Sequence, residues 1–265
     1  QAYDNEELWE PYVSANDANV IDAYKNKCGF ITGNVLDGSV LIVNTDLIGD
    51  IKIEGYEDLL NPALKGKIAT ADPANSSSAF AHLTNMLLAM GGYEDDKAWQ
   101  YVHDLFENVD GKICESSSGV YKGVADGEYV VGLSYEDPCA QLVLDGAPVK
   151  LVYMKEGVIS KPDGIYIIKN AKHMENAKKF IDFVTSKEAQ TLITQKLHRR
   201  SVRDDVPAPA GVTGRMYFEV EIAGRRLRLA LVDGAIDPEF IRLGRKSKAG
   251  EATPADEARW TELKE

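Results

Sequence analysis

Short apolar segments alternate with segments of helical spacing along most of this chain. Residues 38–46, GSVLIVNTD, form a continuous apolar run that ends in Asn and Asp, which is typical of a buried strand before a turn. Residues 76–92 and 96–109 instead place apolar side chains at helical spacing. Strands that are apolar on both faces are typical of sheets covered by helices, so the pattern predicts an α/β fold with a largely parallel sheet. In such folds, ligands bind where strands end and helices begin.

The alternation continues to residue 197. We expect a short helix, a proline break and a strand within 56–73, then a strand, a serine-rich loop, a helix and a strand within 111–138. Strands should follow at 147–154 and 164–169. An amphipathic helical stretch is predicted for 176–197, with an apolar side made of Phe180, Phe183, Val184 and Leu192.

Arginine usage divides the chain. No arginine precedes Arg199, whereas arginines are frequent from there to Arg259. Residues 211–265 hold equal numbers of acidic and basic side chains, so the formal net charge of −12 lies in residues 1–210. The Pro-rich segment 204–211 is typical of a linker or an extended arm. We therefore expect two regions of different origin, a larger one at 1–210 and a segment of uncertain origin at 211–265.

The second region is predicted to form a β-hairpin and a helix. Residues 216–231 alternate strictly, and a two-residue turn at 223–224 would place Ile222 opposite Arg225. The same register pairs Glu221 with Arg226, Val220 with Leu227, Glu219 with Arg228 and Phe218 with Leu229. One face then carries charge pairs and the other apolar pairs. A Thr cap followed by Pro predicts a terminal helix at 253–264.

Composition excludes several classes of protein. A net charge of −12 argues against nucleic acid or an anionic membrane as the main partner. No run of about 18 apolar residues is present that could span a membrane. The chain begins at Gln1 without a basic and apolar leader, so we expect any signal peptide to be absent from this chain. The cysteines form no CxxC pair; Cys28, Cys114 and Cys139 fit small buried residues, and a Cys114–Cys139 disulfide is the alternative.

Two serine-rich segments stand between an expected strand and an expected helix. They are DPANSSS, residues 72–78, and ESSSGVYK, residues 115–122. A serine at a helix start satisfies an orphan amide, so ordinary capping explains either segment alone. Further hydroxyls, free amides and the positive end of the helix dipole also suit a phosphate or a carboxylate. Because both segments follow strands of one α/β unit, they are expected to converge on one pocket.

A third strand end carries GLSYEDP, residues 132–138. Tyr135 could stack on a ligand or hydrogen-bond to it, and Glu136 and Asp137 could accept hydrogen bonds from hydroxyls or an amine. Asp137 before a proline is also typical of a helix start. The sequence has no nucleophile elbow, phosphate loop, dinucleotide fingerprint or HExxH motif. We therefore expect no enzyme, no catalytic residue, no bound metal and no cofactor; an enzyme on the same fold, with Glu136 or Asp137 as its base, is the alternative.

Several segments, in this order along the chain, resemble one family. They are VLIVNTD, YEDLLNPALKGKIATADPANSSSA, DGEYVVGLSYEDP, NAKKFIDFVTSKEAQTLI and HRRSVRDDV. They are similar to the substrate-binding proteins of ABC importers, in the branch of the type II periplasmic-binding fold with ferric-iron, sugar-phosphate and phosphonate binders. The likeness covers about residues 7–210 and implies a sheet-and-helix lobe of a two-lobed protein. Such proteins close on a small ligand and present it to a membrane permease.

The resemblance also implies which residues line the cleft between the lobes. They are the first helix start (Asn75, Ser76, Ser77 and Ser78), the second serine loop (Ser117, Ser118 and Gly119) and the strand end (Tyr135, Glu136 and Asp137). These side chains suit a small anionic solute such as a sugar phosphate, a phosphonate or a carboxylate. Ferric binders of the branch carry two adjacent tyrosines at the strand end, where this chain has Tyr135 and Glu136. A ferric-iron-binding protein is the alternative.

The chain departs from the family at both ends. Family members begin with a long segment that builds most of the first lobe and has no counterpart here, and residues 212–250 do not match the family's usual ending. A second chain that supplies the missing lobe, or a truncated, permuted or chimeric assembly piece without binding activity, is the further alternative. The partners implied are an anionic solute and permease subunits, with no nucleic acid. The location implied is the periplasm or an anchored position at the extracellular surface.

Overall fold

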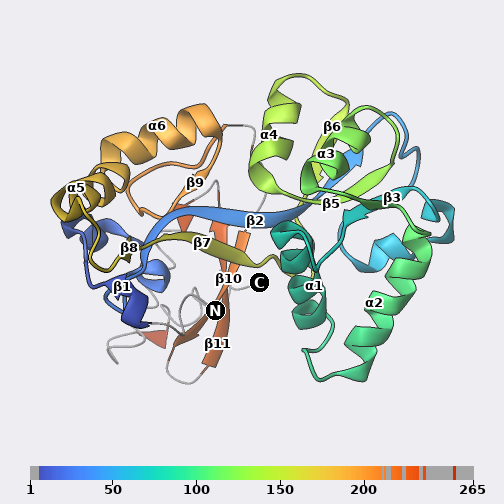
Figure 1. Cartoon of the computed structure of the whole chain (residues 1–265). Coiled ribbons are helices and arrows are strands. Elements are labelled where there is room, and N and C mark those ends of the chain that lie inside the picture. Colours follow the sequence, from blue (N-terminus) through green and yellow to red (C-terminus); the bar gives the residue numbers. More distant parts are fainter. Residues whose placement is uncertain are drawn as a thin grey trace. The chain divides into compact units, whose positions relative to one another are not determined.

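The computed structural model describes residues 6–210, 212, 216–222, 225–232, 235–236 and 253–254. The chain divides into two compact units, and each is described by itself. Unit 1 comprises Gln1–Asp37 and Lys161–Ala210, and unit 2 comprises Gly38–Ser160 and Gly211–Glu265. Figure 1 shows the path of the chain and labels the α-helices and most of the strands of the described residues.

The main sheet of unit 2 has the strand order β4-β3-β5-β2-β6. These strands are β4 (Ile113–Cys114), β3 (Ile68–Ala71), β5 (Val131–Tyr135), β2 (Thr32–Asn44) and β6 (Val149–Val152). β3 is parallel to both β4 and β5. β2 runs antiparallel to both β5 and β6, so the expected largely parallel sheet is in fact mixed. The prediction missed this because β2 enters from unit 1 and not through a crossover helix, which is what fixes a parallel direction.

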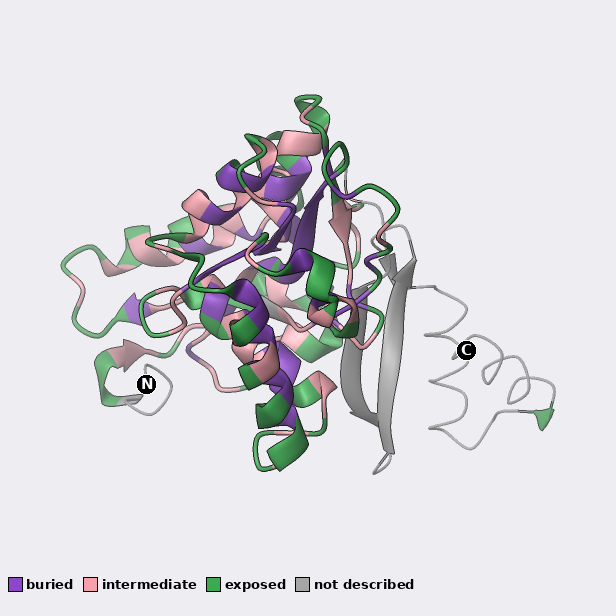
Figure 2. Cartoon of the chain, turned by 90° about the vertical axis from the view of Figure 1, so that its right-hand side faces the viewer, coloured by how far each residue is buried: buried purple, intermediate pink, exposed green. Residues whose placement is uncertain are grey.

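The apolar run in β2 is buried on both faces. Leu41 and Val43 belong to one core cluster, with residues of α1 (Ser77–Ala89) and α2 (Asp96–Val109). Val40 and Ile42 belong to another, with residues of α3 (Ser117–Ala125) and α4 (Glu136–Leu144). Successive side chains of a strand point to opposite faces, so the two clusters lie on opposite sides of the sheet. Figure 2 shows buried residues concentrated on the strands and on the inner faces of the helices.

Unit 1 combines two helices with short strand pairs. The helices are α5 (Met174–Val184) and α6 (Lys187–Leu197). β1 (Trp9–Glu10) pairs antiparallel with β8 (Ile167–Ile168), and β9 (Arg200–Ser201) pairs antiparallel with the first half of β2. β7 (Ser160–Ile165) also pairs with β2, so the strand expected at 164–169 is divided between β7 and β8. The described part of the chain also contains short 3-10 helices: η1 (Glu6–Leu8), η2 (Ala15–Asn19), η3 (Asp22–Tyr24), η4 (Glu57–Leu60) and η5 (Pro62–Leu64).

The helical stretch predicted for 176–197 is two helices. α5 ends before Thr185, and Ser186 caps α6 by accepting a hydrogen bond from the Ala189 amide at 3.2 Å. A serine that caps a new helix needs a non-helical backbone, which interrupts the stretch. The spacing of apolar residues did not reveal this break because the two helices have similar periodicity.

The apolar side predicted for this stretch is not its buried side. Phe180 and Phe183 are 58% and 64% exposed, whereas Ile181 is buried. Polar contacts place the buried face of α5, because the Tyr12 hydroxyl and the Ser14 hydroxyl each donate to the Asp182 carboxylate at 2.7 Å. Leu192 of α6 is also exposed, and Val184 is half-buried.

The predicted hairpin register is confirmed. β10 (Met216–Ile222) and β11 (Arg225–Val232) pair antiparallel with Ile222 opposite Arg225 and Phe218 opposite Leu229, and β12 (Ala235–Ile236) adds a third strand. The predicted turn at 223–224 and most of the predicted helix at 253–264 lie outside the described residues.

All three cysteines are described, and all are free. Cys139 is buried and Cys114 is half-buried, so no disulfide joins them. Burial raises the pKa of the Cys139 thiol to about 12. Cys139 therefore remains a protonated thiol that packs as a small apolar residue.

Candidate functional site

Three helices begin at the carboxyl ends of three adjacent strands. β3 leads into α1, β4 into α3 and β5 into α4. β3 lies between β4 and β5 and is parallel to both, so the carboxyl ends of all three strands share one edge of the sheet. We call this edge, with the first turns of α1, α3 and α4, the strand-end site. It brings together, within unit 2, the three segments that the sequence singled out.

The first turn of α1 is held by serine capping. Ser76 Oγ accepts a hydrogen bond from the amide three residues on at 3.4 Å and lies 3.1 Å from Ser78 Oγ. Asn75 Nδ2 donates to Asp72 Oδ2 at 2.6 Å. Ser77, the first helical residue, is exposed. Ser76 therefore acts as a cap, while the side chains of Asn75 and Ser77 face solvent.

The first turn of α3 repeats this arrangement. Ser116 Oγ accepts from the Gly119 amide at 3.3 Å and lies 2.8 Å from Ser118 Oγ. Ser117 and Ser118 are half-buried. Sequence reasoning selected Ser117, Ser118 and Gly119 but missed the cap itself, Ser116. The parallel with the first serine triplet was the available signal, because in both triplets the first serine caps and approaches the third.

The start of α4 carries two acids and no side-chain cap. Glu136 and Asp137 form its first turn after Tyr135. Glu136 is only 2% exposed, and the Tyr153 hydroxyl donates a hydrogen bond to its carboxylate. Asp137 and Tyr135 are half-buried. Glu136 therefore contacts Tyr153, which follows β6 and which no sequence motif marks.

Tyrosines from two elements meet at the strand-end site. The rings of Tyr121 in α3 and Tyr135 are arranged edge to face, with centroids 6.2 Å apart. Burial raises the pKa of Tyr121, and the charge of Asp137 acts in the same direction. The Tyr121 hydroxyl therefore stays protonated near neutral pH and remains a hydrogen-bond donor.

A buried histidine supports the strand-end site from within unit 2. His82 of α1 lies with Nε2 2.6 Å from the carbonyl oxygen of Ser134, the residue before Tyr135. Because a carbonyl only accepts, Nε2 carries the proton and Nδ1 accepts from the Tyr56 hydroxyl at 2.9 Å. Asn85 Nδ2 donates to the same Tyr56 oxygen at 2.7 Å. Burial lowers the pKa of His82 to about 4, so the imidazole is neutral at neutral pH. We call the hydrogen-bonded chain of His82, Tyr56 and Asn85 the relay.

The strand-end site is suited to an anion that also carries hydroxyl groups. The first amides of each helix have no partner inside the helix, and the helix dipole adds partial positive charge there. Three such ends at one edge, together with serine hydroxyls, favour a phosphate or a carboxylate. The carboxylates of Asp72 and Asp137 can accept hydrogen bonds from hydroxyls on the rest of a ligand.

A sheet that gathers helix starts at its carboxyl edge, in a chain that passes repeatedly between two units, is an arrangement that solute-binding proteins share with other α/β proteins. The comparison with family models distinguishes between them for this chain. Residues 7–216 match the family described as bacterial extracellular solute-binding protein, and the chain belongs to that family. The family predicted from the sequence is thereby confirmed.

The chain resembles both curated relatives and solved structures. The iron uptake protein A1 of Synechocystis is 24% identical over 212 residues, which cover 77% of this chain and 58% of that protein. A solved structure described as a two-component system protein that mediates signal transduction is 31% identical, with a TM-score of 0.65, and the match covers 78% of this chain and 68% of that one. The periplasmic binding protein AfuA of Actinobacillus pleuropneumoniae, solved with fructose-6-phosphate bound, is 27% identical, with a TM-score of 0.71 and coverage of 81% and 69%.

The chain is shorter than these relatives. It spans 55% and 58% of the length of two of the curated relatives that it matches. Among the described residues, no helix combines the length and the apolar composition that crossing a membrane requires.

Proposed function

We propose that this chain captures a small anionic solute for an ABC importer and that the solute binds at the strand-end site. The observation that carries the proposal is the convergence of three helix starts at one sheet edge, two of them with the same serine arrangement. The relative solved with fructose-6-phosphate supports a ligand that joins a phosphate to a polyol. Phosphonates and carboxylates share the anionic group and belong to the same proposal.

Each part of the strand-end site has a role in this proposal. Amides and hydroxyls for the anionic group come from Ser77, Ser78, Ser117 and Ser118. Asn75, Ser76 and Gly119 hold the two helix starts in shape through their bonds to Asp72, Ala79 and Ser116. Tyr135 packs against the remainder of the solute, and Asp137 accepts hydrogen bonds from its hydroxyls. Glu136 acts through Tyr153, whose hydroxyl it holds in place. No step in this function breaks a covalent bond, in agreement with the family's role as solute binders.

The test is calorimetric titration of the chain with fructose 6-phosphate, a phosphonate and a tricarboxylate, with fructose as the uncharged control. Two variants, Ser77→Asp and Ser117→Asp, separate binding from folding. An acid in the first turn stabilises a helix by about 0.3–1 kcal/mol. The same charge opposes a bound anion by roughly 1–4 kcal/mol at close range, so binding should weaken about fivefold or more.

Asn176→Asp is the matched control. It also adds one negative charge to the first turn of a helix, at an exposed position of α5 in unit 1. Anion affinity should be unchanged in this variant. If the Ser77→Asp and Ser117→Asp chains bind the anions as well as the original chain does, the strand-end site is not where the anion binds.

Ferric iron is a second candidate ligand, favoured by the iron uptake relative and by Tyr121, Tyr135 and Tyr153 near the strand-end site. Phenolate ligands would have to form there, and the raised pKa of Tyr121 opposes this. Titration with ferric citrate, followed by the visible absorption of tyrosinate-bound iron, distinguishes iron from a phosphate-bearing solute.

Two further parts of the proposal concern partners. The chain would deliver its solute to the permease subunits of the importer, from the periplasm or the extracellular surface. The alternative in which a second chain completes the cleft is tested by the mass of the assembly in solution. A monomer that binds solute would contradict that alternative.

A further inference from the structure

A group of possible metal ligands lies on α2, an element that contributes no residue to the strand-end site. His103, Asp104 and Glu107 each offer one donor atom, and these atoms all lie within 4.8 Å of one another. His103 Nδ1 is 3.6 Å from Asp104 Oδ1, and His103 Nε2 is 3.9 Å from Glu107 Oε1. Residues 103 and 107 are one helical turn apart and therefore share a face.

The backbone that carries these side chains is firmly packed. On the inner side of α2, Leu105 and Val109 are fully buried in the core of unit 2. Asn108 donates from Nδ2 to the carbonyl of Leu59 at 2.6 Å, which ties α2 to η4. The spacing of the three donors is therefore set by a rigid helix, and only side-chain rotations are needed to adjust it.

The donor spacing is close to what a transition-metal ion requires. Zinc binds imidazole nitrogen and carboxylate oxygen at about 2.0–2.2 Å, which places ligands of a tetrahedral site about 3.4 Å apart. The separation of 3.6 Å between His103 Nδ1 and Asp104 Oδ1 exceeds this by a few tenths of an ångström. The 3.9 Å to Glu107 is measured from the other ring nitrogen, and one donor atom from each of the three residues lies within 4.8 Å of the others. Rotation of the Glu107 side chain, which is 71% exposed, can bring its carboxylate to the ring nitrogen that binds the ion.

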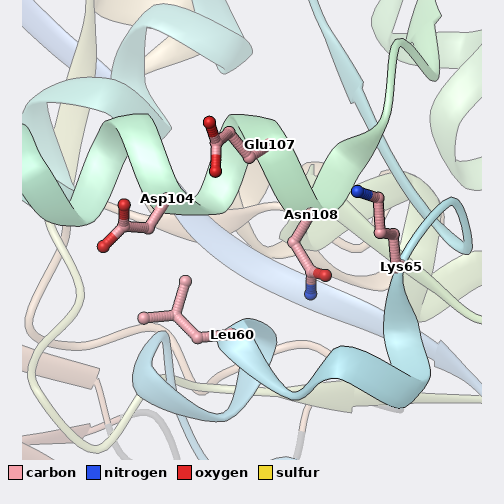
Figure 3. A pocket seen from close by; sticks show the side chains of 5 residues that line it. All are labelled: Leu60, Lys65, Asp104, Glu107 and Asn108. Carbon is pink, nitrogen blue, oxygen red and sulfur yellow. The ribbon is translucent and has the colours of Figure 1, made fainter.

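The surroundings support one of the ligands and leave room for water. Gln100 Nε2 donates to Asp104 Oδ1 at 2.7 Å, the kind of outer contact that orients a ligating carboxylate. Asp104 and Glu107 line a hollow of about 300 Å³, together with Leu60, Lys65 and Asn108 (Figure 3). Water in this hollow can complete the coordination. Lys65 is the cation that lines it, and its charge limits the affinity.

We propose that His103, Asp104 and Glu107 bind a divalent transition-metal ion of the zinc class at the surface of unit 2. One imidazole and two carboxylates favour zinc over calcium or magnesium, which prefer all-oxygen sites. Three protein ligands from one helix, with water at the remaining positions, form an open site. The competing interpretation is that these are surface ion pairs without a metal, each of which contributes little to stability.

The test is titration of the tag-free, chelator-treated full chain with zinc, followed by calorimetry and by the NMR signals of the histidine rings. We expect one ion per chain, with the shifts confined to the ring of His103. His103→Gln and Glu107→Gln should each weaken binding roughly tenfold or more, since outer contacts alone contribute 10–100-fold. A large excess of magnesium should not compete.

His173→Gln is the control, because His173 is also exposed but lies at the start of α5 in unit 1. Zinc affinity should be the same in this variant as in the original chain. The proposal is overturned if millimolar zinc does not bind, or if His103→Gln and His173→Gln bind alike. The outcome does not depend on whether the strand-end site binds an anion.

Discussion

Acidification should destabilise this protein through His82. The imidazole is buried, with a pKa lowered from 6.5 to about 4 because burial disfavours its charged form. Between about pH 6.5 and pH 4 the unfolded chain binds a proton at His82 that the folded chain does not. Stability from this residue is therefore fully present above about pH 6.5 and is lost as the pH falls toward 4.

The size of the effect follows from the same pKa difference. A pKa that falls from 6.5 to about 4 corresponds to roughly 3 kcal/mol of stability. Domains of ordinary stability have about 5–15 kcal/mol in total, so the loss should be easy to measure. The structure explains the cost, because a proton on Nδ1 would face the Tyr56 hydroxyl, which already donates to that atom.

Urea unfolding followed by tryptophan fluorescence, at several pH values from 7 to 4, measures the loss. His82→Gln is the informative variant, since its amide can still donate to the Ser134 carbonyl and accept from Tyr56 but cannot titrate in this window. The variant should lose most of the pH dependence. Should His82→Gln fail to fold, NMR titration of the original chain gives the same information. A His82 ring that titrates near pH 6.5, or parallel pH curves for the two chains, would refute the reasoning.

Three further changes test the packing and the caps by urea denaturation. Ser116→Ala removes the cap of α3 and should cost about 1 kcal/mol, whereas Ser117→Ala, next to it, should cost less. Asp205→Ala should cost roughly 3 kcal/mol, because it leaves the buried Arg203 guanidinium without the carboxylate that accepts two of its hydrogen bonds at 2.7 and 2.9 Å. Leu105→Ala, at a fully buried position of α2, should cost about 2–5 kcal/mol, and a loss below 1 kcal/mol would mean that the core of unit 2 is packed differently.

Local patterns predicted much of the fold. The strict alternation at 216–231 fixed the hairpin register, because each residue in a strand determines the face of the next. The apolar run around Leu41 predicted a strand buried on both faces, and the two core clusters confirm it. The direction of β2 could not be predicted in this way, because a run buried on both faces reads the same in either direction.

In the strand-end site too, local features could be predicted from the sequence and contacts between distant residues could not. Its serine triplets were visible because capping is a local interaction between residues three apart. The partner of Glu136 was not visible, since Tyr153 reaches it from the segment that follows β6. The relay through His82, Tyr56 and Asn85 was also missed, because its members come together only in the packed core. Phe180 and Phe183 misled the prediction for α5, where contacts to Asp182 decide which face is covered.

The division of the chain into units also sets an order of events during synthesis. The main sheet of unit 2 lies in one continuous stretch, and its last strand, β6, is complete at Val152. Unit 1 is interrupted by that stretch, and β9, which pairs with the first half of β2, is not made until Ser201. Chains fold from the amino terminus as they emerge from the ribosome. The five strands from β2 to β6 can therefore pair before β9 is made, whereas the pairing of β9 with the first half of β2 cannot form until Ser201 has been added.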